Sequence, residues 1–242
     1  ELIRPYTIGK LEGVSKSAAF GTIVVERIID TFSFLILVAI MPLVYDGPLR
    51  ETFPWLEDAR IWISVVTLAG LVFIVSLVVR RDWADDAIRV MSRILPARIR
   101  EKLHRLSHSF LDGFLFLKKP KNFALIFGQS IAVWFLYICM VYAAFFAFNL
   151  DLDFGAAIVV QTISSIGIAV PTPGGTGSYH VFASQTLTQL FGVSSEVALS
   201  YATVTHGFGF IGTMIIGLYY FFKDHLKVSE AVAEPVHKTA EV

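Results

Sequence analysis

The stretch AVPTPGGTGSYH, residues 169–180, separates two apolar runs of the sequence. It contains two prolines, and proline lacks a backbone N–H and pushes the residue before it out of helical geometry. Because Val170 and Thr172 each precede a proline, a helix that enters this stretch is expected to end near Ala169. The stretch therefore predicts a break between two helices.

The second half of the stretch is rich in glycine, which adopts positive φ angles at little steric cost. The glycines are Gly174, Gly175 and Gly177. Thr176 or Ser178 is expected to cap the next helix, since hydroxyl side chains accept hydrogen bonds from its first free N–H groups. Backbone N–H groups at a helix start also suit an anion such as a phosphate. An ordinary loop between two helices is the alternative interpretation.

The composition of the chain is typical of a membrane protein. Hydrophobic residues make up 55% of the 242 residues, charged residues only 17%, and the mean hydropathy is +0.66. Apolar runs of about 18 residues or more indicate bilayer spans. We expect such spans at residues 18–44, 61–79, 123–148 and 197–222. The single cysteine, Cys139, excludes an internal disulfide.

Two shorter apolar runs flank the break. Residues 154–170 are barely long enough to cross a bilayer at about 1.5 Å per residue, and residues 181–191 are too short alone. A re-entrant hairpin at residues 154–191 and two full crossings would both return the chain to the side of the membrane from which it entered. Length therefore decides between them, and it favours the hairpin. The predicted fold class is all-α: a polytopic transmembrane helical bundle, residues 1–222, with a Pro/Gly-broken, re-entrant helix pair.

The distribution of positive charge predicts the orientation. Residues 80–121 carry eleven Lys and Arg against five acids, whereas residues 46–60 carry four acids and two Arg. Lys and Arg concentrate in cytoplasmic loops, so residues 80–121 and a disordered tail at 223–242 are expected on the cytoplasmic side of the cell (inner) membrane. Residues 80–121 also show apolar residues at helical spacing with basic side chains beside them. Such an amphipathic helix lies in the headgroup region of a membrane, where its basic side chains contact anionic lipids. Packing of this helix on the bundle is the alternative.

Three charged residues lie inside the first apolar run: Glu26, Arg27 and Asp30. Each costs about 2.5–3.5 kcal/mol at the centre of a membrane helix on insertion scales, so the group needs compensation. Their spacing places them on one helical face, where they partly neutralise one another. They form either a buried ion-pair network that fixes helix register, or the polar wall of a cavity that handles a headgroup or a proton.

The last apolar run contains His206 and a series of small residues at four-residue spacing, Gly209, Thr213 and Gly217. Small residues at this spacing let helices pack closely, which is the role predicted for these glycines. His206 is a candidate to titrate or to donate a hydrogen bond within a cavity. A histidine satisfied within the core is the alternative interpretation.

Two regions of the chain resemble a known family. ELIRPYTIGKLEGVSKSAAFGTIVVERIIDT (residues 1–31) and VPTPGGTGSYHVF (residues 170–182) are similar to the signature regions of the lysylphosphatidylglycerol synthase transmembrane family, also called flippase-like domain proteins. The resemblance implies a helical inner-membrane domain that, in multiple peptide resistance factors, moves aminoacylated phospholipid between leaflets. It implies functional roles for Glu1, Arg4, Pro5, Glu26, Arg27, Asp30, Pro173, Gly174, Gly175 and Gly177.

The chain also departs from the family pattern. Members usually begin one or more helices earlier, so an N-terminal truncation is expected here. The soluble aminoacyltransferase domain of the full synthases has no counterpart in this sequence, so aminoacylation by this chain is not expected. Many relatives have an acidic residue soon after the glycine-rich turn, where this chain has Tyr179 and His180. This difference leaves the chemistry of the headgroup open.

The leading hypothesis is a lipid-handling membrane protein that binds or translocates a phospholipid or a polyprenyl-phosphate lipid. The candidate substrate-binding residues are Arg4, Glu26, Arg27, Asp30, Pro173, Gly174, Gly175, Gly177, His180 and His206. One alternative is an accessory or catalytic subunit for glycan or acyl transfer from a lipid carrier, with Glu26 or Asp30 as a base. Another is a membrane scaffold without a substrate site. We expect no cofactor, metal ion or nucleic acid, and a homo-oligomer or a partner synthase as the candidate protein partner.

Overall fold

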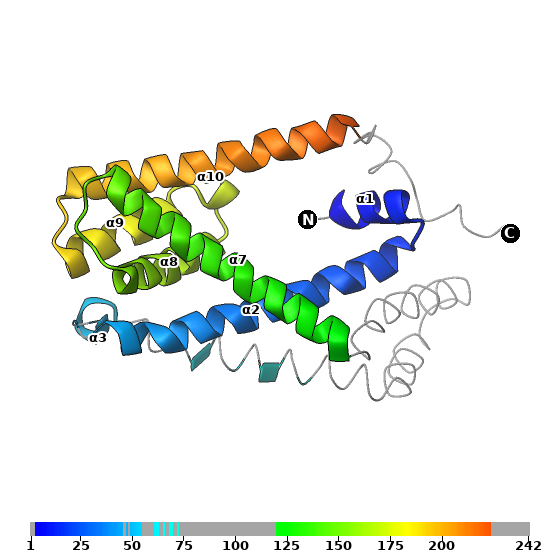
Figure 1. Ribbon diagram of the computed structural model, residues 1–242, viewed down its shortest axis with the longest axis horizontal. Coiled ribbons are helices and arrows are strands. Elements are labelled where there is room, and N and C mark those ends of the chain that lie inside the picture. The colour runs from blue at the N-terminus through cyan, green and yellow to red at the C-terminus, as the bar shows by residue number, and fades with distance from the viewer. Residues whose placement is uncertain are drawn as a thin grey trace, which may run out of the picture. The chain divides into compact units, whose positions relative to one another are not determined.

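The computed structural model describes residues 3–45, 47, 49–54, 61, 62, 65, 68, 69, 72 and 120–223. Every regular element that these residues form is a helix (Figure 1), so the predicted all-α class is confirmed. In chain order the elements are α1 (Ile3–Glu12), α2 (Lys16–Val44), α3 (Leu49–Thr52), α7 (Pro120–Ala147), α8 (Phe154–Ala169), the short 3-10 turn η3 (Pro173–Gly175), α9 (Ser178–Phe191) and α10 (Ser195–Lys223).

Two of the described helices are long and apolar enough to cross a membrane. They are residues Ala124–Ala147 of α7 and the whole of α10. The apolar helix α8 is shorter, with 16 residues. The predicted first span lies in α2, a helix of 29 residues that contains four charged side chains and is not one of these two. Of the predicted second span, residues 61–79, six residues are described, and all six are helical.

The predicted break between helices is present. α8 ends at Ala169, as expected, and the next residue, Val170, has extended φ and ψ angles of −67° and 128°. The start of α8 is also set locally, because the carboxylate of Asp153 accepts a hydrogen bond from the Ala156 N–H at 2.7 Å. Such a side-chain cap satisfies one of the free donors of a helix start. α8 is therefore bounded by a cap at one end and by prolines at the other.

The described residues fall into two compact units. The first consists of residues 3–28, 72, 120–124 and 217–223. In it, Tyr6 and Val25 are buried, and the ammonium of Lys16 lies 4.8 Å from the centroid of the Tyr6 ring. Cations over an aromatic face are attracted to its negative π surface.

The second unit consists of the described part of residues 29–69 and of residues 125–216. Its core joins apolar side chains of α2, α7, α8, α9 and α10. The rings of Phe145 and Tyr201 are fully buried there, with centroids 5.7 Å apart. The Tyr201 hydroxyl donates to the Val141 carbonyl at 3.2 Å, so the buried hydroxyl is satisfied.

A glycine of α8 lies close to the neighbouring helix. α8 and α9 lie side by side (Figure 1), and a Cβ atom at Gly167 would lie 2.9 Å from the Cβ of Phe182. By contrast, among the described residues a Cβ at Gly209 or Gly217 of α10 would meet nothing within 4 Å. The predicted close packing of these α10 glycines stays a prediction.

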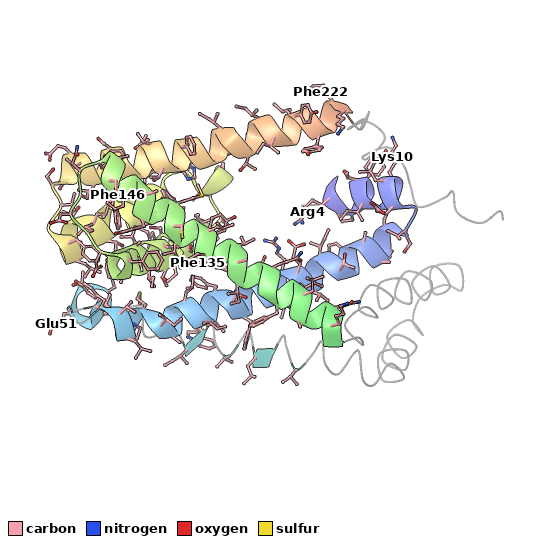
Figure 2. All side chains as sticks on the ribbon, viewed as in Figure 1. Arg4, Lys10, Glu51, Phe135, Phe146 and Phe222 are labelled. Atoms are coloured by element: carbon pink, nitrogen blue, oxygen red, sulfur yellow. The ribbon has the colours of Figure 1, made fainter. Side chains whose placement is uncertain are left out.

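Apolar side chains project outward from α7. Phe135 and Phe146, labelled in Figure 2, are 55% and 65% exposed. Large exposed apolar surfaces are unusual on soluble monomers and suit contact with lipid or with another protein. The predicted basic segment 80–121 lies outside the described residues except for its last two, and so does the predicted tail 223–242 except for Lys223.

Candidate functional site

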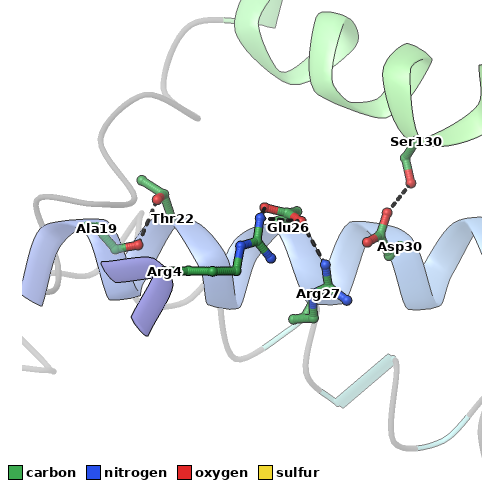
Figure 3. A network of polar contacts seen from close by, with 7 residues as sticks. All are labelled: Arg4, Ala19, Thr22, Glu26, Arg27, Asp30 and Ser130. Atoms are coloured by element: carbon green, nitrogen blue, oxygen red, sulfur yellow. Dashed lines mark hydrogen bonds and ion pairs between the residues drawn. The ribbon is translucent and has the colours of Figure 1, made fainter. Parts of the chain in front are cut away.

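The first group of candidate residues lies where α1 meets α2 (Figure 3). Arg4 Nη2 donates to both carboxylate oxygens of Glu26, at 3.3 Å and 3.1 Å. Arg27 Nη2 donates to Oε1 of the same carboxylate at 2.7 Å. One carboxylate is thus shared by two guanidinium groups, and we call Arg4, Glu26 and Arg27 the arginine–glutamate cluster.

The arginine–glutamate cluster joins two guanidinium groups to one carboxylate. The side chains of Arg4, Glu26 and Arg27 are 44%, 39% and 53% exposed. In water, ion pairs with this exposure contribute only about 0–1 kcal/mol to stability. The ion pairs of this cluster alone therefore give little stability to the fold.

Asp30, the third charged residue of the predicted face, has a partner on α7. Ser130 Oγ donates to Oδ1 of Asp30 at 2.5 Å, and Ser130 is only 6% exposed (Figure 3). The hydroxyls of Thr22 and Ser33, on the same predicted face, donate instead to carbonyls of their own helix. Ser130 was not predicted as a site residue from the sequence. The signal that could have indicated it is a hydroxyl side chain inside the apolar run at residues 123–148.

The glycine-rich turn has the backbone geometry that the sequence predicted. Gly174 has φ 62° and ψ 20°, Gly175 has φ 72°, and Gly177 has φ 90° and ψ −62°. Pro173 opens the 3-10 turn, and the N–H of Thr176, the residue that follows the turn, donates to the Pro173 carbonyl. The N–H of Gly175 donates to the Thr172 carbonyl at 3.1 Å, so this N–H already has a hydrogen-bond partner. A residue with a Cβ atom would have a strained backbone at these φ angles.

The predicted cap of the second helix is wrong. Gly177 is the capping residue of α9, and no hydroxyl caps the helix. Instead, the Gly177 N–H donates to Nδ1 of His180 at 3.3 Å. The Ser178 hydroxyl faces back into the turn, 2.9 Å from the Thr172 hydroxyl and 3.3 Å from the Gly175 carbonyl. The hydroxyl that was expected to cap α9 is therefore used to close the turn.

The two candidate histidines meet beside this turn. The ring centroids of His180, on α9, and His206, on α10, are 5.0 Å apart. Tyr179 lies with its ring centroid 5.0 Å from that of His206, and its hydroxyl is 3.1 Å from the Thr205 hydroxyl. Cε1 of His206 lies 3.6 Å from the position of a Cβ atom on Gly175. The structure thus brings His180, His206 and the glycines together within the second unit.

Comparison with known proteins decides the family. Residues 1–217 match the model of the family described as the lysylphosphatidylglycerol synthase TM region. The chain belongs to this family. The match takes in every candidate site residue and confirms the resemblance seen in the sequence. Members of the lysylphosphatidylglycerol synthase TM region family are membrane proteins, in agreement with the two apolar helices.

Individual relatives support this assignment. Two UPF0104 membrane proteins of Methanothermobacter thermautotrophicus are each 27% identical to the chain. One is similar over 188 residues, 74% of this chain and 55% of the relative. The other is similar over 215 residues, 81% of this chain and 59% of the relative, so the chain spans little more than half the length of either. No solved structure matches the chain.

Proposed function

We propose that this family member binds the headgroup phosphate of a membrane lipid and moves the lipid between the leaflets of the cell membrane. The lipid is a phospholipid or a polyprenyl phosphate. The observation that carries the proposal is the arginine–glutamate cluster, in which one carboxylate is shared by two guanidinium groups. The family assignment and the apolar helices place this cluster in a membrane protein.

The guanidinium groups of the cluster favour an anionic ligand. Those of Arg4 and Arg27 are held together at one carboxylate, on side chains that are 44% and 53% exposed. A phosphate that approaches them gains charge-assisted hydrogen bonds. Guanidinium groups suit this task, because their planar donor arrangement matches phosphate oxygens better than an ammonium does. Glu26 would hold both guanidinium groups in position.

The glycine-rich turn is a second supporting feature. Its positive φ angles bring backbone to the surface at the start of α9, where the first N–H groups of a helix have no partner within the helix. In transporters, broken helices with such starts bind anionic groups of substrates. Pro173, Gly174, Gly175 and Gly177 would shape an anion contact within the second unit, although the Gly175 N–H bonds within the turn.

The proposal predicts opposite effects for two neighbouring charge changes. Arg27→Gln removes one of the two guanidinium groups, and we expect the protein purified from its own membrane to retain about tenfold less anionic lipid. Glu26→Gln removes a negative charge but keeps an amide oxygen that can accept from both guanidinium groups, so its retention is expected to equal or exceed that of the wild type. Native mass spectrometry of gently extracted protein measures the retained lipid and identifies it.

Glu12→Gln is the matched control, because it makes the same chemical change at the exposed end of α1. It is expected to leave the retained lipid unchanged. A purely structural role of the ion pairs predicts a different pattern, in which Arg27→Gln and Glu26→Gln are equally harmful. That pattern, or wild-type lipid retention by folded Arg27→Gln, would contradict the proposal.

A further inference from the structure

Two imidazole rings at the glycine-rich turn are arranged as a pair. His180 and His206 are both half-buried, and their ring planes meet at 61°. The ring of Phe210 is stacked on His206 with the centroids 6.3 Å apart, and Tyr179 packs against both imidazoles. Because aromatic rings hold the pair from the sides, the imidazoles have a defined orientation toward the turn.

Both imidazoles lie against the backbone of the turn. Nδ1 of His180 accepts a hydrogen bond from the Gly177 N–H at 3.3 Å, and Cε1 of His206 lies 3.6 Å from the position of a Cβ atom on Gly175. Among the described residues, Nε2 of His180 has no hydrogen-bond partner, and His206 has at least one ring nitrogen without one. Polar groups inside a membrane protein need a partner, so these two nitrogens point to a ligand or water.

The hydrogen bond to His180 decides what kind of ligand fits. An imidazole that accepts at Nδ1 carries its proton on Nε2, so the outer nitrogen of His180 is a donor. A metal ion would need the reverse, a lone pair on the outer nitrogen and a proton on the inner one. The described residues also contain no group of three His, Cys, Asp or Glu that could hold a metal. The ligand is therefore an acceptor.

We infer that His180 and His206 bind the oxygens of a phosphate group at the turn. Nε2–H of His180 donates to one oxygen, and a ring N–H of His206 donates to another. Charge-assisted hydrogen bonds of this kind are about twice as strong as neutral ones. The inference rests on the proposed function for its source, a lipid headgroup, whereas free phosphate would offer the same oxygens.

The experiment uses protein labelled with 15N-histidine in maltoside micelles, which contain no phosphate. The probes are dioctanoyl phosphatidic acid, dioctanoylglycerol and inorganic phosphate. Phosphatidic acid is expected to shift the ring signals of two of the six histidines, those lost in His180→Gln and His206→Phe, and dioctanoylglycerol to shift neither. Inorganic phosphate is expected to shift the same two signals at higher concentration, because it lacks the acyl chains.

Three variants separate recognition from packing. His180→Gln and His206→Phe are each expected to weaken phosphatidic acid binding about tenfold, and His206→Phe keeps a ring against Tyr179 and Phe210. Tyr179→Phe is the matched control: it removes a hydroxyl bonded to Thr205 but keeps both imidazoles, so binding is expected within about twofold of the wild type. Cooperative thermal unfolding verifies that each variant is folded.

The outcomes distinguish this inference from the proposed function. Binding of phosphatidic acid by folded His180→Gln and His206→Phe at wild-type strength would overturn the inference, while lipid loss in Arg27→Gln would still support the function. Binding of inorganic phosphate without phosphatidic acid would overturn the lipid source. If the wild type retains no anionic lipid from its own membrane, the proposed function fails, whatever the imidazole signals show.

Discussion

Gly177→Ala is expected to lower the free energy of unfolding by about 1–3 kcal/mol, the usual cost of a strained backbone conformation. Gly177 has φ 90° and ψ −62°, a region that residues with a Cβ rarely adopt. A Cβ at this position would meet nothing within 4 Å. The expected loss therefore comes from backbone strain alone and not from a clash with a neighbour.

Gly128→Ala is the matched control for this strain. Gly128 lies within α7, has no positive φ, and a Cβ there would also meet nothing within 4 Å. In a helix, the same change is expected to raise the free energy of unfolding by about 0.5–1 kcal/mol. Reversible unfolding in mixed detergent micelles measures both variants. Equal effects at the two positions would show that the turn does not need a positive φ at Gly177.

Gly167→Leu is expected to lower the free energy of unfolding by about 1–3 kcal/mol through overpacking. A Cβ at Gly167 would lie 2.9 Å from the Cβ of Phe182 and 3.0 Å from two of its ring atoms. Phe182 belongs to α9, so α8 and α9 would have to move apart to admit the new side chain. Their separation would weaken the apolar cluster around Ile163, which both helices help to bury.

A double variant tests whether the contact with Phe182 causes this loss. Adding Phe182→Ala to Gly167→Leu removes the obstructing ring, and we expect the pair to be less destabilised than the sum of the single changes. Gly207→Leu on α10 is the control, because a Cβ there would meet nothing within 4 Å. Additive effects of the two changes would rule out the steric explanation. The same unfolding measurement applies to all four variants.

Local chemistry explains what could be predicted about the turn. Proline restricts the residue before it, so the end of α8 at Ala169 follows from the positions of Pro171 and Pro173. The positive φ angles follow from the glycines. The cap of α9 could not be predicted in this way, because the Ser178 hydroxyl has a competing partner in Thr172, six residues earlier in the chain.

Contacts between distant residues explain what the sequence left open about the candidate site. The charges on α2 were predicted as a group, but Arg4 contributes from 22 residues earlier, and its pairing with Glu26 leaves no periodic signal. Ser130 approaches Asp30 across 100 residues of sequence. Small-residue spacing predicted close packing at Gly209, whereas among the described residues a close approach is found at Gly167, which has no such pattern.

The most direct test of the central claim follows lipid movement itself. The full-length protein is placed in proteoliposomes that contain a trace of phosphatidylglycerol with a fluorescent headgroup, and the label in the outer leaflet is bleached chemically. We expect the wild type to exchange the labelled lipid between leaflets faster than protein-free vesicles do, Arg27→Gln to be about tenfold slower than wild type, and Glu12→Gln to be unchanged. Exchange by the wild type at the rate of protein-free vesicles would contradict the account.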